Sequence, residues 1–81
     1  MAESFDILST MRNVEIIAAG QGVRSRKALN RMFGVGRWKK MKGVPDLRLD
    51  DGRLCEAEVH WYEAHGIGRV LFKRKRTIKW V

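Results

Sequence analysis

The sequence predicts an α+β domain in which two N-terminal helices pack on one face of a three-stranded antiparallel sheet. Apolar residues recur at helical spacing in the first third of the chain, and apolar and polar residues alternate in the last third. Short segments containing glycine separate these patterns. A chain of 81 residues can supply one hydrophobic core, so residues 1–81 are expected to form a single domain.

The first helix is predicted at about residues 4–19. Ser4 is a suitable N-cap, and Gly20 follows the last helical position. The apolar side of this helix would consist of residues at three-residue spacing, namely Phe5, Leu8, Met11 and Val14. A short strand over residues 14–17 is the alternative, because β-branched residues dominate there.

The second helix is predicted at about residues 25–33, with Ser25 as its N-cap and glycines at 34 and 36 after its end. Its core side would hold Ala28, Leu29, Met32 and Phe33. The stretch that follows, residues 34–43, is expected to be a loop. Its Gly-Val-Gly lacks the third glycine of a dinucleotide-binding fingerprint and does not follow a strand.

The first two strands are predicted at about residues 44–49 and 53–64. The turn between them, Asp50-Asp51-Gly52, suits a hairpin in which Gly52 takes a left-handed conformation. This turn places Leu47 opposite Cys55, so both would lie on one face of the sheet. We expect that face to pack against the helices, since it also carries Ala57, Val59 and Trp61.

The third strand is predicted at about residues 69–80, after the loop His65-Gly66-Ile67-Gly68. With Ala64 opposite Arg69, the expected cross-strand pairs are Tyr62 with Leu71, His60 with Lys73, Glu58 with Lys75 and Glu56 with Thr77. Most of these residues are polar and would share the second face of the sheet. A slip of one residue in the third strand would exchange its two faces.

The formal net charge of +8 is unevenly distributed. Residues 24–42 contain eight Lys and Arg and residues 69–81 contain six, without any acidic residue in either block. This pattern favours a nucleic-acid partner, RNA before DNA, although solubility or an acidic protein partner would also account for it. Trp38 would either stack on a base or cover the core. The candidate nucleic-acid-binding residues are Arg26, Lys27, Arg31, Arg37, Trp38, Lys39, Lys40, Lys42, Arg74 and Arg76.

Several classes of protein are disfavoured. The single cysteine, Cys55, cannot form an internal disulfide, which favours a reducing cytoplasm, although a secreted toxin fragment would show the same pattern. The longest apolar run, residues 16–19, is far shorter than a transmembrane helix. The histidines and their neighbours lack a zinc-binding spacing, so we expect no metal and no other cofactor.

His60 is the main candidate for catalysis. Metal-independent RNA cleavage needs a base for the 2′-hydroxyl proton, an acid for the leaving 5′-oxygen and cations for the phosphorane charge. On the expected polar face, His60 would act as base or acid with Glu58 as its partner, while Lys73 and Lys75 hold the phosphate. Tyr62 would contact a base of the RNA. The alternative is a surface histidine among ordinary cross-strand ion pairs.

The segment AEVHWYEAHGIGR, residues 57–69, and the following FKRKR, residues 72–76, resemble a group of small, mostly uncharacterised bacterial proteins and toxin C-termini. That group shares a GxGxW-K-x-K-G loop, matched here by Gly34, Gly36, Trp38, Lys40, Lys42 and Gly43. The expected order of elements is also similar to that of RelE-type toxins and the wider barnase/colicin/RelE group of metal-independent ribonucleases. This likeness implies an active site on the sheet and an acidic antitoxin or immunity protein as partner.

Together these patterns predict a small, basic, toxin-type endoribonuclease that cuts RNA by attack of the 2′-hydroxyl. A non-catalytic nucleic-acid-binding module and an adaptor for an acidic protein are the alternatives. Strand scission separates the first from the second, and salt-dependent affinity for RNA separates both from the third.

Overall fold

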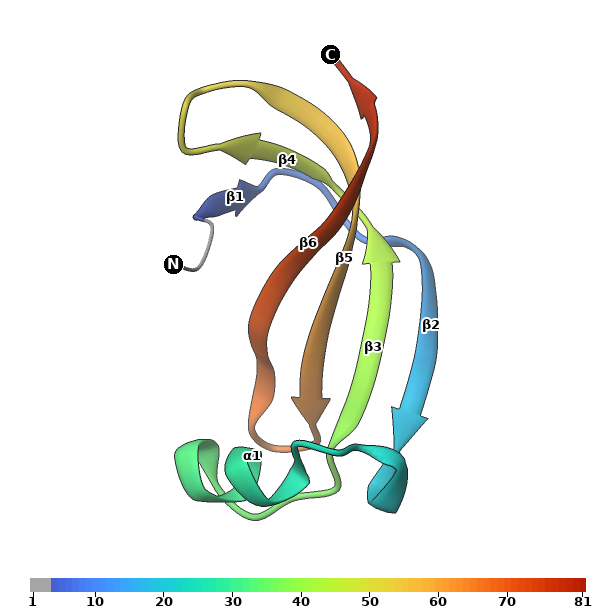
Figure 1. Ribbon diagram of the computed structural model, residues 1–81, viewed down its shortest axis with the longest axis vertical. Coiled ribbons are helices and arrows are strands. Elements are labelled where there is room, and N and C mark those ends of the chain that lie inside the picture. Colours follow the sequence, from blue (N-terminus) through green and yellow to red (C-terminus); the bar gives the residue numbers. More distant parts are fainter. Residues whose placement is uncertain (1–3) are drawn as a thin grey trace.

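The computed structural model of the protein describes residues 4–81, which form one six-stranded antiparallel sheet and a single α-helix (Figure 1). The elements are β1 (Phe5–Ile7), β2 (Arg12–Ala19), a 3₁₀ turn (Gly20–Gly22), α1 (Arg26–Phe33), β3 (Lys39–Val44), β4 (Asp46–Leu49), β5 (Leu54–Ala64) and β6 (Gly68–Trp80). The predicted fold class, two helices on a three-stranded sheet, is therefore wrong. The first three residues of the expected domain lie outside the described range.

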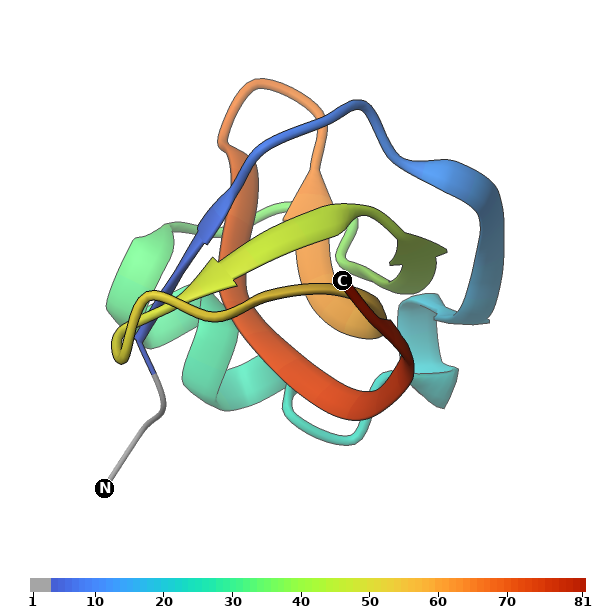
Figure 2. The ribbon, with the colours of Figure 1, turned by 90° about the horizontal axis from the view of Figure 1, so that it is seen from above.

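Strand β5 is the centre of the sheet, because three other strands pair with it. Along one edge β3 pairs with residues 59–63 and β4 with residues 54–56, while β6 follows the other edge. Pro45 separates β3 from β4, since it has no N–H for the ladder, and its carbonyl accepts a hydrogen bond from the Ala57 N–H at 3.2 Å. The strands curve around a common interior, as the view from above shows (Figure 2).

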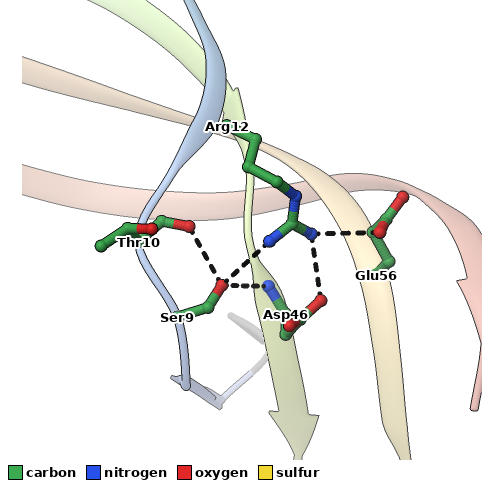
Figure 3. Close-up of polar contacts among 5 residues, drawn as sticks. All are labelled: Ser9, Thr10, Arg12, Asp46 and Glu56. Carbon is green, nitrogen blue, oxygen red and sulfur yellow. Dashed lines mark hydrogen bonds and ion pairs between the residues drawn. The ribbon is translucent and has the colours of Figure 1, made fainter.

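The connection between β1 and β2 is tied to the centre of the sheet by Arg12 (Figure 3). Its guanidinium donates to Asp46 Oδ1 at 3.0 Å, on β4, and to Glu56 Oε2 at 3.1 Å, on β5. The Ser9 hydroxyl oxygen accepts hydrogen bonds from Arg12 and from the Asp46 N–H. These polar contacts fix where the first segment of chain crosses from β4 to β3.

The first predicted helix is wrong, because residues 4–19 form β1 and β2. The three-residue apolar spacing does not correspond to one buried face: Phe5 and Met11 pack against the core, whereas Leu8 and Val14 are exposed. The β-branched alternative over residues 14–17 describes the structure better. Helix propensities differ between ordinary residues by only a few tenths of a kcal/mol. Pairing of β2 with β3 decides the conformation of this segment instead, because it depends on a partner strand and not on local preference.

The position of the second predicted helix is confirmed as α1, but it covers a different face from the one expected. Its predicted core side is wrong except for Leu29, because Ala28, Met32 and Phe33 are exposed. Its buried Leu29 packs with Val23, Trp38 and Ala64 in a small cluster at one end of the sheet. Ala64 alternates with the core residues of β5 and so lies on the opposite face from them. The expected loop over residues 34–43 is wrong in its second half, which forms β3. This lysine-rich strand gives little sequence signal, because Met41 is the one apolar side chain on its buried face.

The main core lies on the predicted apolar face of β5, but strands cover it instead of helices. Buried side chains from three neighbouring strands meet there, and the sheet closes over them by its own curvature. The Trp61 and Phe72 rings stack with their centroids 5.6 Å apart. The members of the cluster are Met41, Leu47, Leu49, Cys55, Ala57, Val59 and Trp61, with Phe5, Met11 and Phe72 packed against it.

The other strand predictions are close to the structure. The strands expected at about 53–64 and 69–80 are β5 and β6, and the one expected at 44–49 is β4 with the last residue of β3. The turn at residues 50–52 is confirmed, with Gly52 at a φ of +89° and Leu47 paired with Cys55. The residues of the turn were therefore sufficient to predict this register.

Gly43 is the position in β3 where a side chain has no room. A Cβ there would lie 3.0 Å from Trp61 Cη2 and 3.4 Å from Met11 Cβ. We expect Gly43→Ala to lower the free energy of unfolding by about 1–3 kcal/mol, because overpacking displaces the Trp61 ring. Urea denaturation followed by tryptophan fluorescence measures the change.

Gly22→Ala is the matched control, since a Cβ at Gly22 meets only Ala18 Cβ at 3.8 Å, an ordinary contact. Its stability should stay within about 1 kcal/mol of the wild type, because glycine replacement also restricts the unfolded chain. Equal stability of the two variants would show that Trp61 does not fill the space beside Gly43.

Candidate nucleic-acid interface

The face of the sheet opposite the main core holds a shallow pocket of about 260 Å³. Three strands contribute to it: β3 through Lys40, β5 through His60 and Tyr62, and β6 through residues 71–75. Its lining consists of Lys40, His60, Trp61, Tyr62, Leu71, Lys73 and Lys75. We call the surface formed by Lys40, Lys42, Glu58, His60, Tyr62, Leu71, Lys73, Lys75 and Arg76 the His60 face.

Irregular pairing between β5 and β6 decides which cations reach this face. The register shifts at three places along β6, so that extra residues are accommodated as bulges. At the first shift Leu71 takes a φ of +58°, and Lys73 comes opposite His60 as predicted. The other predicted pairs are wrong, because the partners of Tyr62, Glu58 and Glu56 are Val70, Arg76 and Lys79. Ala64 likewise pairs with Gly68 and not with Arg69.

Glu58 and His60 form a hydrogen-bonded pair within the His60 face. The distance between His60 Nε2 and Glu58 Oε2 is 2.9 Å, and the side chains are only 17% and 20% exposed. The hydrogen bond from His60 lowers the pKa of Glu58 below its ordinary value of 4.5, and the charge of Arg76 lowers it further. Burial of the carboxyl group opposes these two effects. Glu58 therefore stays ionised and available to orient the imidazole.

The second nitrogen of His60 is the one buried side-chain N or O atom, among residues 4–81, that has no hydrogen-bond partner. A buried polar atom without a partner destabilises the folded state by about 1–3 kcal/mol. It also marks a place where a ligand hydroxyl would gain a hydrogen bond. In the structure Nδ1 is covered, so such a contact requires the ring or its neighbours to move.

Positive charge surrounds this pair. A neighbouring hollow of about 210 Å³ is lined by Lys42, Glu58 and Arg76 among others. Lys42 lies 3.3 Å from Glu15, and Arg76 lies 3.6 Å from Glu58. Lys73 and Lys75 take part in no ion pair within residues 4–81. The face therefore carries more cations than its own carboxylates neutralise.

The predicted catalytic residues come together on this face, whereas the predicted nucleic-acid-binding residues are spread over the molecule. Lys40, Lys42 and Arg76 belong to the His60 face. Arg26, Lys27 and Arg31 lie on α1, and Arg37 and Lys39 line pockets at the end of the sheet near it. Arg74 pairs with Val59 and lies 6.0 Å from the Trp80 ring, on the core side of β6.

Trp38 is a correction to the predicted set. Its side chain is completely buried, and its indole N–H donates to Asn30 Oδ1 at 2.9 Å. It packs against Leu29 and cannot stack on a base, so its role as a cover for the core holds. Leu71 and Glu15, which line the two hollows, were not predicted, because no sequence signal marks a bulge or a cross-strand neighbour in another segment.

No group of three or more His, Cys, Asp and Glu side chains in residues 4–81 is arranged to hold a metal ion. Cys55 is buried in the main core, and His65 is exposed in the β5–β6 turn. No α-helix in this range has the length and apolar character needed to cross a membrane.

Comparison with protein-family models, curated proteins and solved structures gives no match. The resemblance of the GxGxW loop and the HWYEAHGIG hairpin to bacterial toxin C-termini therefore stays a prediction. The likeness to RelE-type ribonucleases rested on the order of elements, and it loses that support because the N-terminal segment forms two strands, β1 and β2, instead of a helix.

Glu58→Gln is expected to make the free energy of unfolding less dependent on pH below about pH 6. Because the folded-state pKa of Glu58 is lowered, its ionised form stabilises the protein above about pH 4.5, and this contribution is lost as the pH falls through the folded pKa. The wild type should thus exceed the variant in unfolding free energy at pH 6, and the gap should close toward pH 3. Urea denaturation at several pH values measures this.

Glu15→Gln is the control, because Glu15 also has a basic partner but its side chain is 64% exposed. Solvent screens such a pair, so its removal should change the pH profile less. A gap between wild type and Glu58→Gln that is the same at pH 6 and pH 3 would contradict the hydrogen bond with His60 as the source.

Proposed function

We propose that this protein binds RNA through the His60 face. The observation that supports the proposal is the convergence of five cations from β3 and β6 around the Glu58–His60 pair: Lys40, Lys42, Lys73, Lys75 and Arg76. Phosphate oxygens are the natural partners of such a set, and the net charge of +8 draws a polyanion toward it.

The shape of the pocket favours a polymer over an enclosed small molecule. Its volume of about 260 Å³ falls below the range of about 300–1,000 Å³ that is usual for small-molecule sites. Tyr62 and Leu71 supply apolar surface within the ring of lysines. One base of a single strand can rest on that surface while its flanking phosphates contact Lys73 and Lys75.

RNA is favoured over DNA because of the polar groups beside the pocket. The 2′-hydroxyl both donates and accepts hydrogen bonds, so it can pair with His60 in either protonation state of the ring. DNA lacks this group and would leave the imidazole without a new partner.

The first test is the salt dependence of RNA binding. For wild-type protein and a labelled 16-nucleotide single strand, fluorescence anisotropy should give an affinity that falls steeply with salt. Lys73→Gln/Lys75→Gln should flatten the slope of log affinity against log salt by about 1.4, since each single-strand phosphate contact contributes about 0.7.

Arg48→Gln/Arg53→Gln removes the same charge from β4 and the turn after it, where both arginines already have acidic partners. Its slope should match that of the wild type. Equal slopes for both double variants would show that the His60 face does not hold the phosphates, and the absence of salt-sensitive binding by the wild type would overturn the function itself.

Cleavage of the bound RNA is a second candidate function, favoured by the Glu58–His60 hydrogen bond next to Lys73. In this reaction His60 takes the 2′-hydroxyl proton, and the 2′-oxygen attacks the phosphorus as the bond from phosphorus to the 5′-oxygen breaks. The proton held by His60 then passes to the leaving 5′-oxygen. Glu58 orients the ring through its hydrogen bond, and Lys73 and Lys75 offset the phosphorane charge. Both ring nitrogens are occupied or covered, so catalysis requires the imidazole to turn when RNA binds.

Incubation with RNA in the presence of a metal chelator tests this chemistry. The wild type should produce fragments that end in 2′,3′-cyclic phosphate, and His60→Gln should lower the rate by about a hundredfold or more, as loss of a general base does. RNA with 2′-O-methyl groups should bind but stay intact. Binding without any scission would leave the protein as a non-catalytic RNA-binding module.

An acidic antitoxin or immunity protein fits the same surface, because its carboxylates would compete with phosphates for the lysines. Such a partner, and a cytoplasmic setting for the encounter with RNA, form part of the proposal.

A further inference from the structure

Two glycine-containing turns, far apart in the sequence, meet at the end of the sheet next to α1 (Figure 1). Ile67, in the turn between β5 and β6, packs over the turn that follows α1. Its Cδ1 atom lies 3.2 Å from where a Cβ of Gly36 would be and 3.6 Å from the equivalent point at Gly34. The glycine-containing parts of the two motifs that stand out in the sequence thus form one structural unit, which lies outside the His60 face.

This end of the molecule carries its own concentration of positive charge. A pocket of about 530 Å³ is lined by Arg37, Lys39, Arg69 and His65, among others. A second pocket of about 390 Å³ shares Arg37 and Lys39 with it and adds Arg26. The two pockets are therefore adjacent and have two cations in common.

The carboxylate in this area is already engaged by the protein. Glu63 Oε1 accepts a hydrogen bond from the Trp61 indole N–H at 2.8 Å and lies 3.6 Å from Arg69 Nε. Arg37 and Lys39 form no ion pair within residues 4–81. They remain available to an external anion.

The backbone of the β5–β6 turn is also open. Gly66 and Gly68 have φ values of +83° and +100°, and no atom lies within 4 Å of the point where a Cβ would stand at either residue. An extended anion can approach the turn closely, because no side chain covers these glycines.

We propose that Arg37, Lys39 and Arg69 form a second phosphate-binding site, which holds the backbone of the same RNA strand that occupies the His60 face. Lys39 and Lys40 are consecutive in β3 and point to opposite faces of the sheet. A strand bound at both sites must therefore pass around the end of the sheet, over the turn at residues 65–67. This inference rests on the proposed function and extends it to the path of the RNA.

The test compares RNA length and charge removal. Single strands of 4 and 16 nucleotides span the usual range of site sizes for a small single-strand-binding fold, about 4–16 nucleotides. The wild type should bind the longer strand more tightly and with a steeper salt slope. Arg37→Gln/Lys39→Gln should reduce this gain and flatten the slope for the 16-nucleotide strand by about 1.4.

That change in slope corresponds to about a sevenfold smaller loss of affinity between 50 and 200 mM salt. Arg48→Gln/Arg53→Gln is again the control for general charge, because β4 and the turn after it, which carry these residues, lie at the far end of the sheet from α1 (Figure 1). Circular dichroism and thermal unfolding confirm that each variant is folded before its affinity is interpreted.

The outcomes separate this inference from the function on which it rests. If Arg37→Gln/Lys39→Gln binds the 16-nucleotide strand as the control does, while Lys73→Gln/Lys75→Gln binds it weakly, the second site is overturned and the His60 face stands. If the wild type binds neither strand, both are overturned. A slope that flattens for Arg37→Gln/Lys39→Gln and not for the control supports the second site.

Discussion

The alternation of side chains along β5 is the constraint on which the rest of the structure depends. Cys55, Ala57, Val59 and Trp61 are almost completely buried, so this strand cannot rotate or shift by one residue without exposing the main core. Its other face is consequently fixed as well. The positions of Glu58 and His60 therefore follow from hydrophobic burial on the opposite side of the same strand, and the pair needs no separate scaffold.

The curvature of the sheet does the work that a helical layer would do in a flatter α+β protein. Pro45 interrupts the strand run that pairs with β5, and the bulges in β6 increase its local twist. Because of these irregularities, the strands of a single sheet surround one apolar interior. The helix α1 therefore does not cover the main core and packs only at one end of the sheet. They also set which basic side chains of β6 face His60, so the shape of the core and the charge of the interface have a common cause.

Charge in this small protein is organised by strand geometry. Side chains alternate along β3, so Lys39 and Lys40 lie on opposite faces. In β6 the bulges place Lys73, Lys75 and Arg76 on the His60 face and Arg74 on the core side. Glu58 and Glu63 make hydrogen bonds with His60 and Trp61, respectively. Each of these carboxylates also lies near an arginine of the protein, Arg76 or Arg69. Lys73 and Lys75, and likewise Arg37 and Lys39, form no ion pair within residues 4–81, and they lie on the two surfaces that we propose to bind phosphate. On one of these surfaces the Glu58–His60 pair offers the groups that acid–base chemistry would use. Because His60 Nδ1 is covered, such chemistry would require the imidazole ring to move.

The sequence by itself determined the features that depend on neighbours within about ten residues. These are α1, the turn closed by Gly52, and the two faces of β5, because local pattern and turn chemistry are enough to specify them. Only the tertiary structure decided the fate of residues 4–19 and 39–44, since their strand state comes from pairing with partners elsewhere in the chain. It also decided the β5–β6 register and the burial of Trp38. A bulge adds one residue without a local signal, and a tryptophan is buried or exposed according to what packs on it.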